Sequence, residues 1–218
     1  MILHRKIQKI KKRLLAIGAI VEEQVDLAVK SIVNRDSELA QKVIDGDVAI
    51  DLMEVDLEEE CLKVLALHQP MAVDLRMIIA VLKINSDLER IGDLAVDATE
   101  RAIALVNQAP IDFPFDFTTM SQAVQKMLKQ SIDALINLDM DLAMQVCASD
   151  DAVDAMHAEV YRRVEEAILQ HPEDIKQELT CLSVSRYLER IADHTTNIAE
   201  DVIYLIQGNI VRHQDTIY

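Results

Sequence analysis

The chain has 218 residues with only 4 Gly, 4 Pro and no Trp, and 3% of its residues are aromatic, a composition that excludes a turn-rich fold and favours long helices around an aliphatic core. Its formal net charge is −16, and so acidic a surface repels a phosphate backbone and argues against nucleic-acid binding. The 3 cysteines have no CxxC spacing and no apolar run reaches the roughly 18 residues that span a bilayer, so we expect a cytoplasmic protein with reduced thiols.

The first predicted helix has apolar residues in alternating steps of three and four, at positions 3, 7, 10, 14, 17, 21, 25, 28 and 32. Residues 1–13 hold six cations and no acid, which leaves 16 cations against 38 acids, a net charge of −22, in the rest of the chain. We expect this basic segment to be a solvated helical face, with peripheral contact to an anionic membrane or an acidic partner as the alternative. The apolar period continues unbroken to Ile32, which argues against a secretory leader.

Two further helices complete the first predicted unit, residues 1–107. Asp36 or Ser37 is expected to cap the second helix, whose apolar stripe is interrupted at Gly46. The next turn contains Pro70, which is expected near the first position of the third helix.

The second half of the chain repeats the first. Residues 108–117 break every period, hold two of the four prolines and all three phenylalanines, and are predicted to be a linker. Residues 118–208 match the first unit at an offset of 103 before their turn and 100 after it, and 209–218 form a tail. The sequence therefore predicts an all-α fold of two tandem antiparallel three-helix bundles with a pseudo-two-fold internal repeat.

One motif occurs in the third helix of both units. It reads Leu88-Glu89-Arg90-Ile91-Gly92-Asp93 in the first and Leu188-Glu189-Arg190-Ile191-Ala192-Asp193 in the second. The two carboxylates of each copy stand at i and i+4, on one face of a helix, where like charges cost a few tenths of a kcal/mol. Because the sequence repeats this cost, a bound cation is the obvious explanation.

The second helix of each unit supplies a facing pair. Asp51 lies 19 residues before Pro70 and Glu89 lies 19 after it, so the two pairs can sit at one height on antiparallel helices. Four converging carboxylates make an all-oxygen site for Mg²⁺, Mn²⁺ or iron, and zinc also fits. The alternative is a solvated acidic face. The predicted metal ligands lie on the bundle surface and are Asp47, Asp51, Glu89, Asp93, Asp150, Asp154, Glu189 and Asp193.

Other candidate residues carry weaker signals. His157 follows Asp154 by three and is either an extra ligand or an ordinary surface histidine. His194 is expected to make a polar contact only. The sequence contains no nucleophile elbow, phosphate-binding loop, Cys/His dyad or HExxH helix. Nothing in it argues for catalysis, and we expect no enzyme.

These stretches resemble the PhoU family, the regulators associated with bacterial phosphate uptake. The resemblance rests on 69–76, Gln-Pro-Met-Ala-Val-Asp-Leu-Arg, and on the two copies of Leu-Glu-Arg-Ile-x-Asp, and it extends over essentially the whole chain. It implies two three-helix bundles with E/DxxxD motifs that hold iron or zinc clusters. Glu89, Asp93, Glu189 and Asp193 correspond to the motif of the third helix in each unit, and the four aspartates of the second helices to its partner.

The resemblance further implies a cytoplasmic, often dimeric, non-enzymatic regulator. Such proteins link the phosphate ABC transporter to a sensor histidine kinase and repress the phosphate-starvation response. The second unit departs from the family pattern, because it lacks the Gln-Pro-x-Ala-x-Asp-Leu-Arg turn and has Asn197 where the first has Asp97.

Two rival hypotheses remain open. A carboxylate-bridged metalloenzyme or iron store of the ferritin-like kind would place Glu-x-x-His pairs inside a four-helix core, whereas neither Glu motif here has a His three residues on. The second rival hypothesis is a purely structural helical adaptor whose acidic face serves only for solubility. Metal titration of the apo-protein separates the adaptor from the rest, and an oxidase assay identifies an enzyme.

Overall fold

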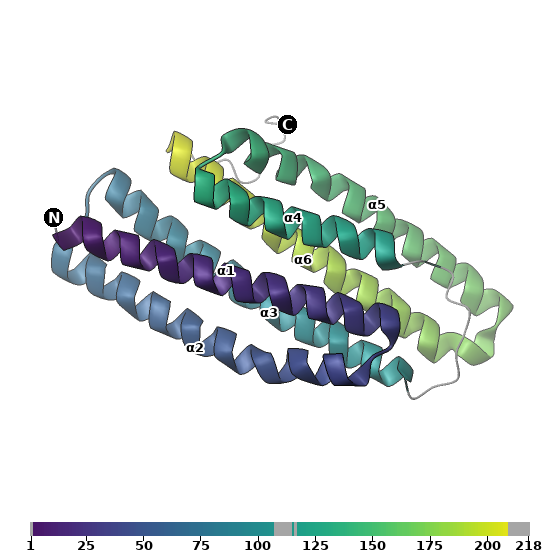
Figure 1. Ribbon diagram of the computed structural model, residues 1–218. Coiled ribbons are helices and arrows are strands. Elements are labelled where there is room, and N and C mark those ends of the chain that lie inside the picture. The colour runs from purple at the N-terminus through teal and green to yellow at the C-terminus, as the bar shows by residue number, and fades with distance from the viewer. Residues whose placement is uncertain (1, 107–114, 116, 209–218) are drawn as a thin grey trace.

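The computed structural model describes residues 2–106, 115 and 117–208, and these residues are almost entirely helical (Figure 1). The predicted all-α class is confirmed. The predicted tail, 209–218, and most of the predicted linker, 108–117, lie outside the described residues, although Phe117 is already the first residue of a helix. The elements are α1 (Ile2–Asn34), α2 (Ser37–His68), α3 (Val73–Val106), α4 (Phe117–Asn137), α5 (Met140–Gln170), the short 3₁₀ helix η1 (Pro172–Asp174) and α6 (Ile175–Gln207).

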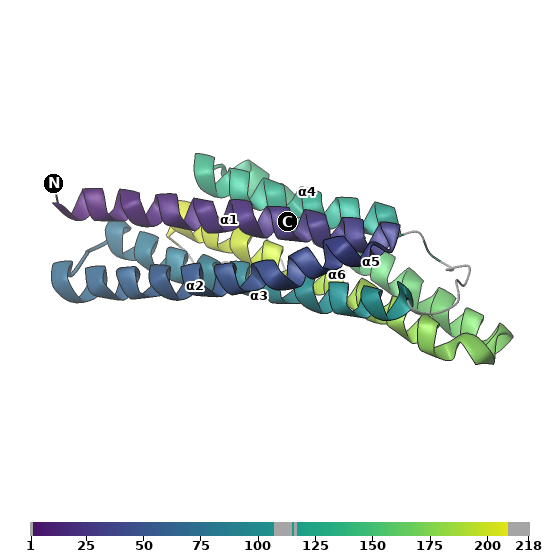
Figure 2. The same ribbon diagram turned by 60° about the horizontal axis from the view of Figure 1, so that its bottom comes forward.

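The six long helices form two antiparallel three-helix bundles that share one body (Figures 1 and 2). Helices α2, α3, α6 and α5 make a row in which each packs on the next, and α1 and α4 lie over this row and touch one another. The most extensive interface joins α3 to α6, the third helix of each bundle. None of the described helices is both long and apolar enough to cross a membrane.

The core follows the predicted apolar stripes. Ile84, Leu88 and Ile91 of α3 are at most 1% exposed, and their counterparts Val184, Leu188 and Ile191 of α6 are equally buried. In each copy of the Leu-Glu-Arg-Ile-x-Asp motif, the helix therefore directs the Leu and Ile side chains toward the core and the two acidic side chains to the other side.

Helix ends largely follow the predicted signals. The Asp36 side chain accepts hydrogen bonds from the backbone N–H groups of Glu38 and Leu39, as an N-cap should. Gly208 ends α6 in the left-handed conformation, with φ of 77°, and its N–H donates to the carbonyl of Tyr204.

One prediction about the turn between α2 and α3 is wrong. Pro70 does not lie near the first position of α3, because that helix begins only at Val73. Residues 69–72 form the turn instead, and Gln69 and Ala72 adopt positive φ angles of 43° and 48°. In the second unit, Pro172 does open a helical turn, η1.

Gly46 does not interrupt α2, which runs through it without a break. The side chain of Gln24, on α1, fills the space beside this glycine and donates a 3.0 Å hydrogen bond to the Val43 carbonyl. A Cβ at position 46 would lie only 2.5 Å from the Gln24 Nε2 atom. The glycine thus allows a buried amide to reach the backbone of the neighbouring helix.

At Gly92, α3 packs tightly against side chains of α2. A Cβ at this position would lie 3.2 Å from Ile50 Cδ1 and 3.4 Å from Asp47 Oδ1. The equivalent residue of the second unit is Ala192, which is fully buried. The fold therefore accepts a methyl group here and little more.

We expect the free energy of unfolding of Gly92→Ala to lie within about 1 kcal/mol of the parent value, because the gain in helix propensity offsets the tight contact with Ile50. Gly92→Leu should lose about 2 kcal/mol or more, because the larger side chain forces α2 away from α3. Urea unfolding of both variants measures the difference. A Leu variant as stable as the Ala variant would contradict the close packing described here.

Candidate metal centre

Three predicted ligands of the first unit converge in the groove between α2 and α3. Asp47 and Asp51, one turn apart on α2, and Asp93 on α3 each offer a carboxylate oxygen, and these oxygens lie within 4.8 Å of one another. We call this group the α2–α3 cluster. Asp51 is exposed while Asp47 and Asp93 are half-buried, so the cluster opens to solvent on one side.

The environment of Asp47 opposes a negative charge. Its Oδ1 atom is enclosed and has no hydrogen-bond partner. Burial, followed by the charges of Asp51 and Asp93, raises the pKa of Asp47 from its ordinary value of 3.8 to about 6. An enclosed carboxylate oxygen without a donor, beside two further carboxylates, is the arrangement that a bound cation would satisfy.

Arg90 partly neutralises this cluster. Its guanidinium lies 3.1 Å from Asp93 Oδ2 and 3.6 Å from Glu89 Oε2. Arg90 itself is exposed, so the side chain can swing into water when another cation takes its place.

Glu89 is not a member of the converging group. Its carboxylate remains close enough to matter, since burial and then the charge of Asp93 raise its pKa. Counted outward from the middle of the 69–72 turn, position 93 lies opposite position 48, between Asp47 and Asp51. Position 89 lies opposite position 52, one residue farther along α2 than the count from Pro70 predicts.

The second unit repeats the arrangement between α5 and α6. Asp150, Asp154 and Asp193 bring carboxylate oxygens within 4.8 Å of one another, and we call them the α5–α6 cluster. Asp150 Oδ1 is enclosed without a hydrogen-bond partner, like Asp47 Oδ1. Burial, then the charges of Asp154 and Asp193, raise the pKa of Asp150 to about 6, although the Thr196 hydroxyl acts in the opposite direction.

Glu189 again stands beside the cluster and outside it. Burial, then the charge of Asp154, raise the pKa of Glu189. Burial and the charge of Glu189 likewise raise the pKa of Asp193. The cations that moderate these shifts include Arg186, which has no counterpart in the first unit because position 86 is Ser.

Polar contacts behind the clusters fix the helix pairs. The Asn85 amide donates to the Glu54 carbonyl at 3.0 Å, joining α3 to α2. At the equivalent place, His157 Nδ1 is hydrogen-bonded to the Ser185 hydroxyl at 2.9 Å. Burial lowers the pKa of His157. The structure thus places His157, for which the sequence left open an extra ligand or a surface histidine, in an interhelical contact and outside the converging group.

His194 makes the polar contact that the sequence predicts, and that contact crosses between the bundles. Its Nδ1 lies 2.9 Å from Asp87 Oδ1, and the Asn197 amide donates to the same oxygen at 3.2 Å. Lys83 of α3 likewise forms a 3.1 Å ion pair with Asp201 of α6, which is 2% exposed. These bonds hold the helices that carry Asp93 and Asp193 in a fixed relation.

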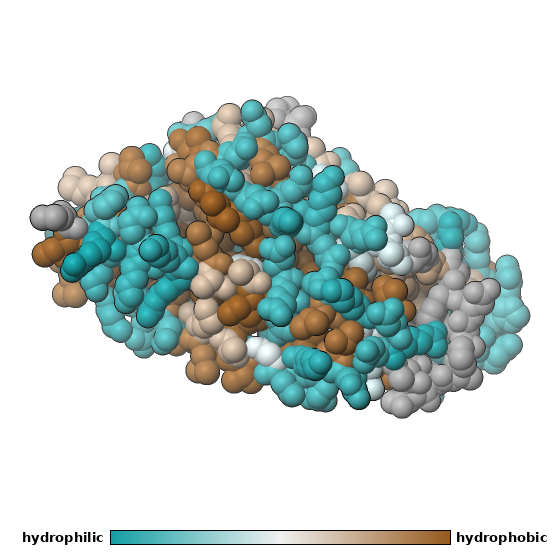
Figure 3. All heavy atoms as spheres, in the orientation of Figure 1, coloured by the Kyte–Doolittle hydropathy of each residue, from teal (hydrophilic) through white to brown (hydrophobic). Residues whose placement is uncertain are grey.

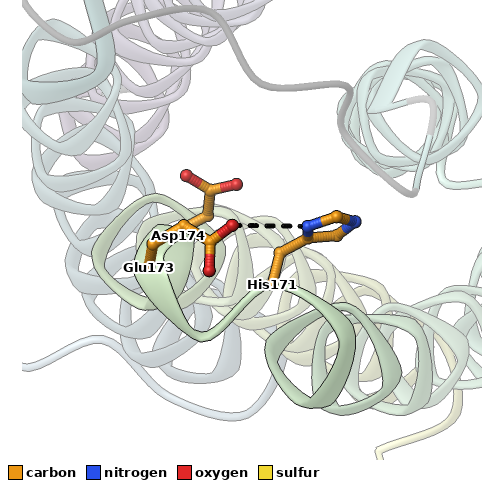
Figure 4. Close-up of side chains that lie close together, drawn as sticks. All are labelled: His171, Glu173 and Asp174. Atoms are coloured by element: carbon orange, nitrogen blue, oxygen red, sulfur yellow. Dashed lines mark ion pairs between the residues drawn. The ribbon is translucent and has the colours of Figure 1, made fainter.

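A third group of possible metal ligands was not predicted from the sequence. His171, Glu173 and Asp174 stand together in the turn between α5 and α6, with the His171 ring beside the Glu173 carboxylate at 3.5 Å (Figure 4). A backbone hydrogen bond and His171 lower the pKa of Glu173, opposite to the shifts at Asp47 and Asp150. Its charge is already stabilised, so the two aspartate clusters remain the better candidates for a metal.

Comparison with known proteins decides the family. A family model described as the PhoU domain matches residues 14–102 and again residues 117–202, one match for each bundle. The chain belongs to the PhoU family. An Aquifex aeolicus PhoU homologue, named a phosphate-specific transport system accessory protein, is 40% identical over 212 residues, which cover 97% of this chain and 96% of that one.

Solved PhoU structures share the fold. The crystal structure of PhoU from Pseudomonas aeruginosa superposes with a TM-score of 0.91 at 39% identity, covering 94% of this chain and 99% of that one. The phosphate transport system regulatory protein PhoU from Streptococcus pneumoniae gives a TM-score of 0.85 at 26% identity, over 96% and 99% of the two chains. The tandem two-bundle architecture is therefore that of the PhoU fold.

The raised pKa values predict how the metal-free protein responds to pH. Below pH 3.8, Asp47 is protonated in the folded and unfolded chain alike; as the pH rises toward its folded pKa of about 6, the unfolded chain releases the proton first and the folded state loses stability. Asp47→Asn removes this loss, so it should stabilise chelator-treated protein by about 1 to 2 kcal/mol near neutral pH, after allowance for solvent screening.

Thermal unfolding at about pH 4.5 and about pH 7.5 measures this effect. The gain in Tm from Asp47→Asn should be larger at the higher pH, and the exposed Asp56→Asn serves as the matched control on the same helix. An equal gain at both pH values, or an equal gain from Asp56→Asn, would remove the case for electrostatic strain at Asp47.

Proposed function

We propose that this chain is a metal-binding regulator of phosphate uptake that acts through protein contacts and without turnover. The observation that carries the proposal is the pair of aspartate clusters, built at equivalent places in two bundles and each containing an enclosed oxygen without a partner. In each bundle, folding brings like charges together, and their repulsion lowers the stability of the folded state. A bound cation would replace this repulsion with attraction and so stabilise the fold.

The donor set indicates the class of metal. Carboxylate oxygens suit Mg²⁺, Mn²⁺ and iron, and zinc accepts carboxylates as well. Asp47, Asp51 and Asp93 would hold the first ion, with Glu89 one turn away as a further ligand after a side-chain rotation. Asp150, Asp154, Asp193 and Glu189 would do the same in the second unit. We propose iron or zinc as the native metal.

A loaded cluster offers a route to regulation. Three carboxylates leave coordination positions open on a six-coordinate ion, and these positions face solvent beside Asp51. Inorganic phosphate or a carboxylate of a partner protein could occupy them. Metal or phosphate supply would then set how strongly the chain binds its partners.

The names of the relatives support a phosphate transport system as one partner. Similar proteins are named accessory proteins of a phosphate-specific transport system. We propose that this chain contacts a phosphate ABC transporter and a sensor histidine kinase at the cytoplasmic face of the membrane, with its basic N-terminal segment toward the anionic lipid surface. A homodimer with closed two-fold symmetry is the expected assembly.

Metal titration tests the cluster assignment. The double variant Asp47→Asn, Asp93→Asn should lose the first site and roughly halve the metal stoichiometry, because neutral amides are poorer ligands for hard cations. Glu89→Gln should weaken binding less, since Glu89 stands outside the converging group. Calorimetry with Mn²⁺ and Zn²⁺ measures both, and unchanged stoichiometry in the double variant would overturn the assignment.

Deletion in the host tests the regulatory role. Without the chain, a phosphate-responsive reporter should stay active in rich phosphate, and the parent sequence should restore repression. A variant lacking Asp47, Asp93, Asp150 and Asp193 carboxylates should fold yet restore repression poorly. Unaltered reporter output and phosphate uptake after deletion would reject the regulatory proposal and leave metal storage, the ferritin-like alternative, as the stronger hypothesis.

A further inference from the structure

The outer face of α2 carries an apolar ridge that the fold does not use. Val48, Leu52, Val55 and Leu62 are 62%, 65%, 51% and 51% exposed. Their spacing of four, three and seven residues puts them in one line along the helix, in the pattern of a coiled-coil seam. The buried residues of α2 occupy its opposite side. We call these four residues the α2 ridge.

The ridge lies at the edge of the molecule. Within the described part of the chain, α2 packs only against α1 and α3, at one end of the row of helices. On the face drawn in Figure 3, hydrophobic side chains lie among hydrophilic ones along the lower edge, where α2 runs. The ridge is therefore available to another molecule.

The internal repeat shows that folding does not require apolar residues there. Helix α5 occupies the equivalent edge of the second bundle. At the offset of 103 it carries Asp151, Ala155, Ala158 and Glu165, all of them exposed. The same architecture thus tolerates charged and small residues at these four positions. At these four positions only the first unit exposes large apolar side chains, and a line of exposed apolar residues of this kind marks interaction sites.

Acidic residues border the ridge on both sides. At about 100° per residue, Asp51 and Glu58 stand roughly 60–80° to one side of the ridge, and Asp45 and Asp56 stand equally far to the other. Between positions 45 and 63 the helix has eight acids and a single base, Lys63, which forms an ion pair with Glu59. A second copy of this chain would bring the same acids against one another, so the ridge is unsuited to self-association through α2.

We propose that the α2 ridge is a docking surface for an amphipathic helix of a partner protein whose apolar seam is bordered by Lys and Arg. Apolar side chains of that helix would pack between Val48, Leu52 and Val55, and its cations would meet the flanking carboxylates. The proposal deepens the regulatory function and rests on it, because it names the chemistry of the partner. Asp51 belongs to the ridge border and to the α2–α3 cluster, so the docking surface adjoins the metal site.

Site-specific photocrosslinking in the host tests the docking surface. A photoreactive residue replaces Leu52 at the centre of the ridge, and the matched control carries it at Ala155 of α5. The full-length protein is crosslinked in living cells and the attached peptides are sequenced by mass spectrometry. We expect Leu52 to capture a helical segment with Lys and Arg on both borders of an apolar seam, and Ala155 not to capture it. Capture of a second copy of this chain, of a segment without cations, or of nothing would overturn the proposal.

A repeat-derived variant separates docking from folding. Val48→Asp, Leu52→Ala, Val55→Ala, Leu62→Glu gives α2 the residues that α5 already carries, so the helical circular dichroism should be unchanged. With the crosslinker moved to Glu59, in line with the ridge, the parent should yield the same product. The variant should lose most of it, and so should the parent in lysate at about 0.5 M salt, where charges are screened within a few ångströms. A product that survives in the variant would contradict the docking surface.

The phosphate reporter distinguishes the two proposals. If the crosslink forms while deletion of the chain leaves the reporter unaltered, the docking surface stands and the regulatory function fails. If deletion derepresses the reporter but no crosslink forms at Leu52, the regulatory function stands and the docking surface fails.

Discussion

The close packing of α2 on α3 is the constraint from which the first cluster follows. At Gly92 the two helices approach so nearly that a Cβ would touch both Ile50 and Asp47. Core residues on one flank of this contact pull the helices together, since Ile50, Leu88 and Ile91 are at most 1% exposed. The acidic side chains on the other flank therefore share one groove, and Oδ1 of Asp47 is enclosed there without a hydrogen-bond partner.

The same constraint is met twice in one chain. Helices α5 and α6 reproduce it with Ala192 in place of Gly92, and Asp150 again loses a hydrogen-bond partner at Oδ1. Because hydrophobic burial stabilises each hairpin by more than the repulsion between the carboxylates costs, the acidic side chains remain together in both grooves. The two hairpins meet along α3 and α6, where Lys83 with Asp201 and His194 with Asp87 fix their relative position.

Much of this was predictable from residue spacing. The apolar steps of three and four in the first helix predicted the buried side of α1, and the facing acids predicted that Asp47, Asp51 and Asp93 would meet. The exact register was not predictable, because it depends on the turn at 69–72, whose left-handed Gln69 and Ala72 leave no sequence signal comparable to a glycine. With the turn at 69–72, position 93 lies opposite position 48, between Asp47 and Asp51, and position 89 lies opposite position 52, one residue beyond Asp51.

Contacts between the units were also beyond the sequence. His194 follows a predicted ligand, and no local pattern reveals that its partner is Asp87, 107 residues earlier. The α2 ridge was hidden for a different reason. Its residues belong to an ordinary heptad pattern, and only the packing of α2 at the edge of the row shows which of two apolar stripes has no neighbour.

Anomalous diffraction tests the central claim most directly, which is that each hairpin holds its aspartates together to bind a cation. Crystals of the full chain, grown without chelator and soaked in Mn²⁺ or Zn²⁺, are measured on both sides of the metal absorption edge. We expect anomalous density within bonding distance, about 2.0–2.2 Å, of the carboxylates of Asp47, Asp51 and Asp93 and of their counterparts in α5 and α6. Density confined to other places, such as the exposed His171 turn, or none at either cluster, would contradict it.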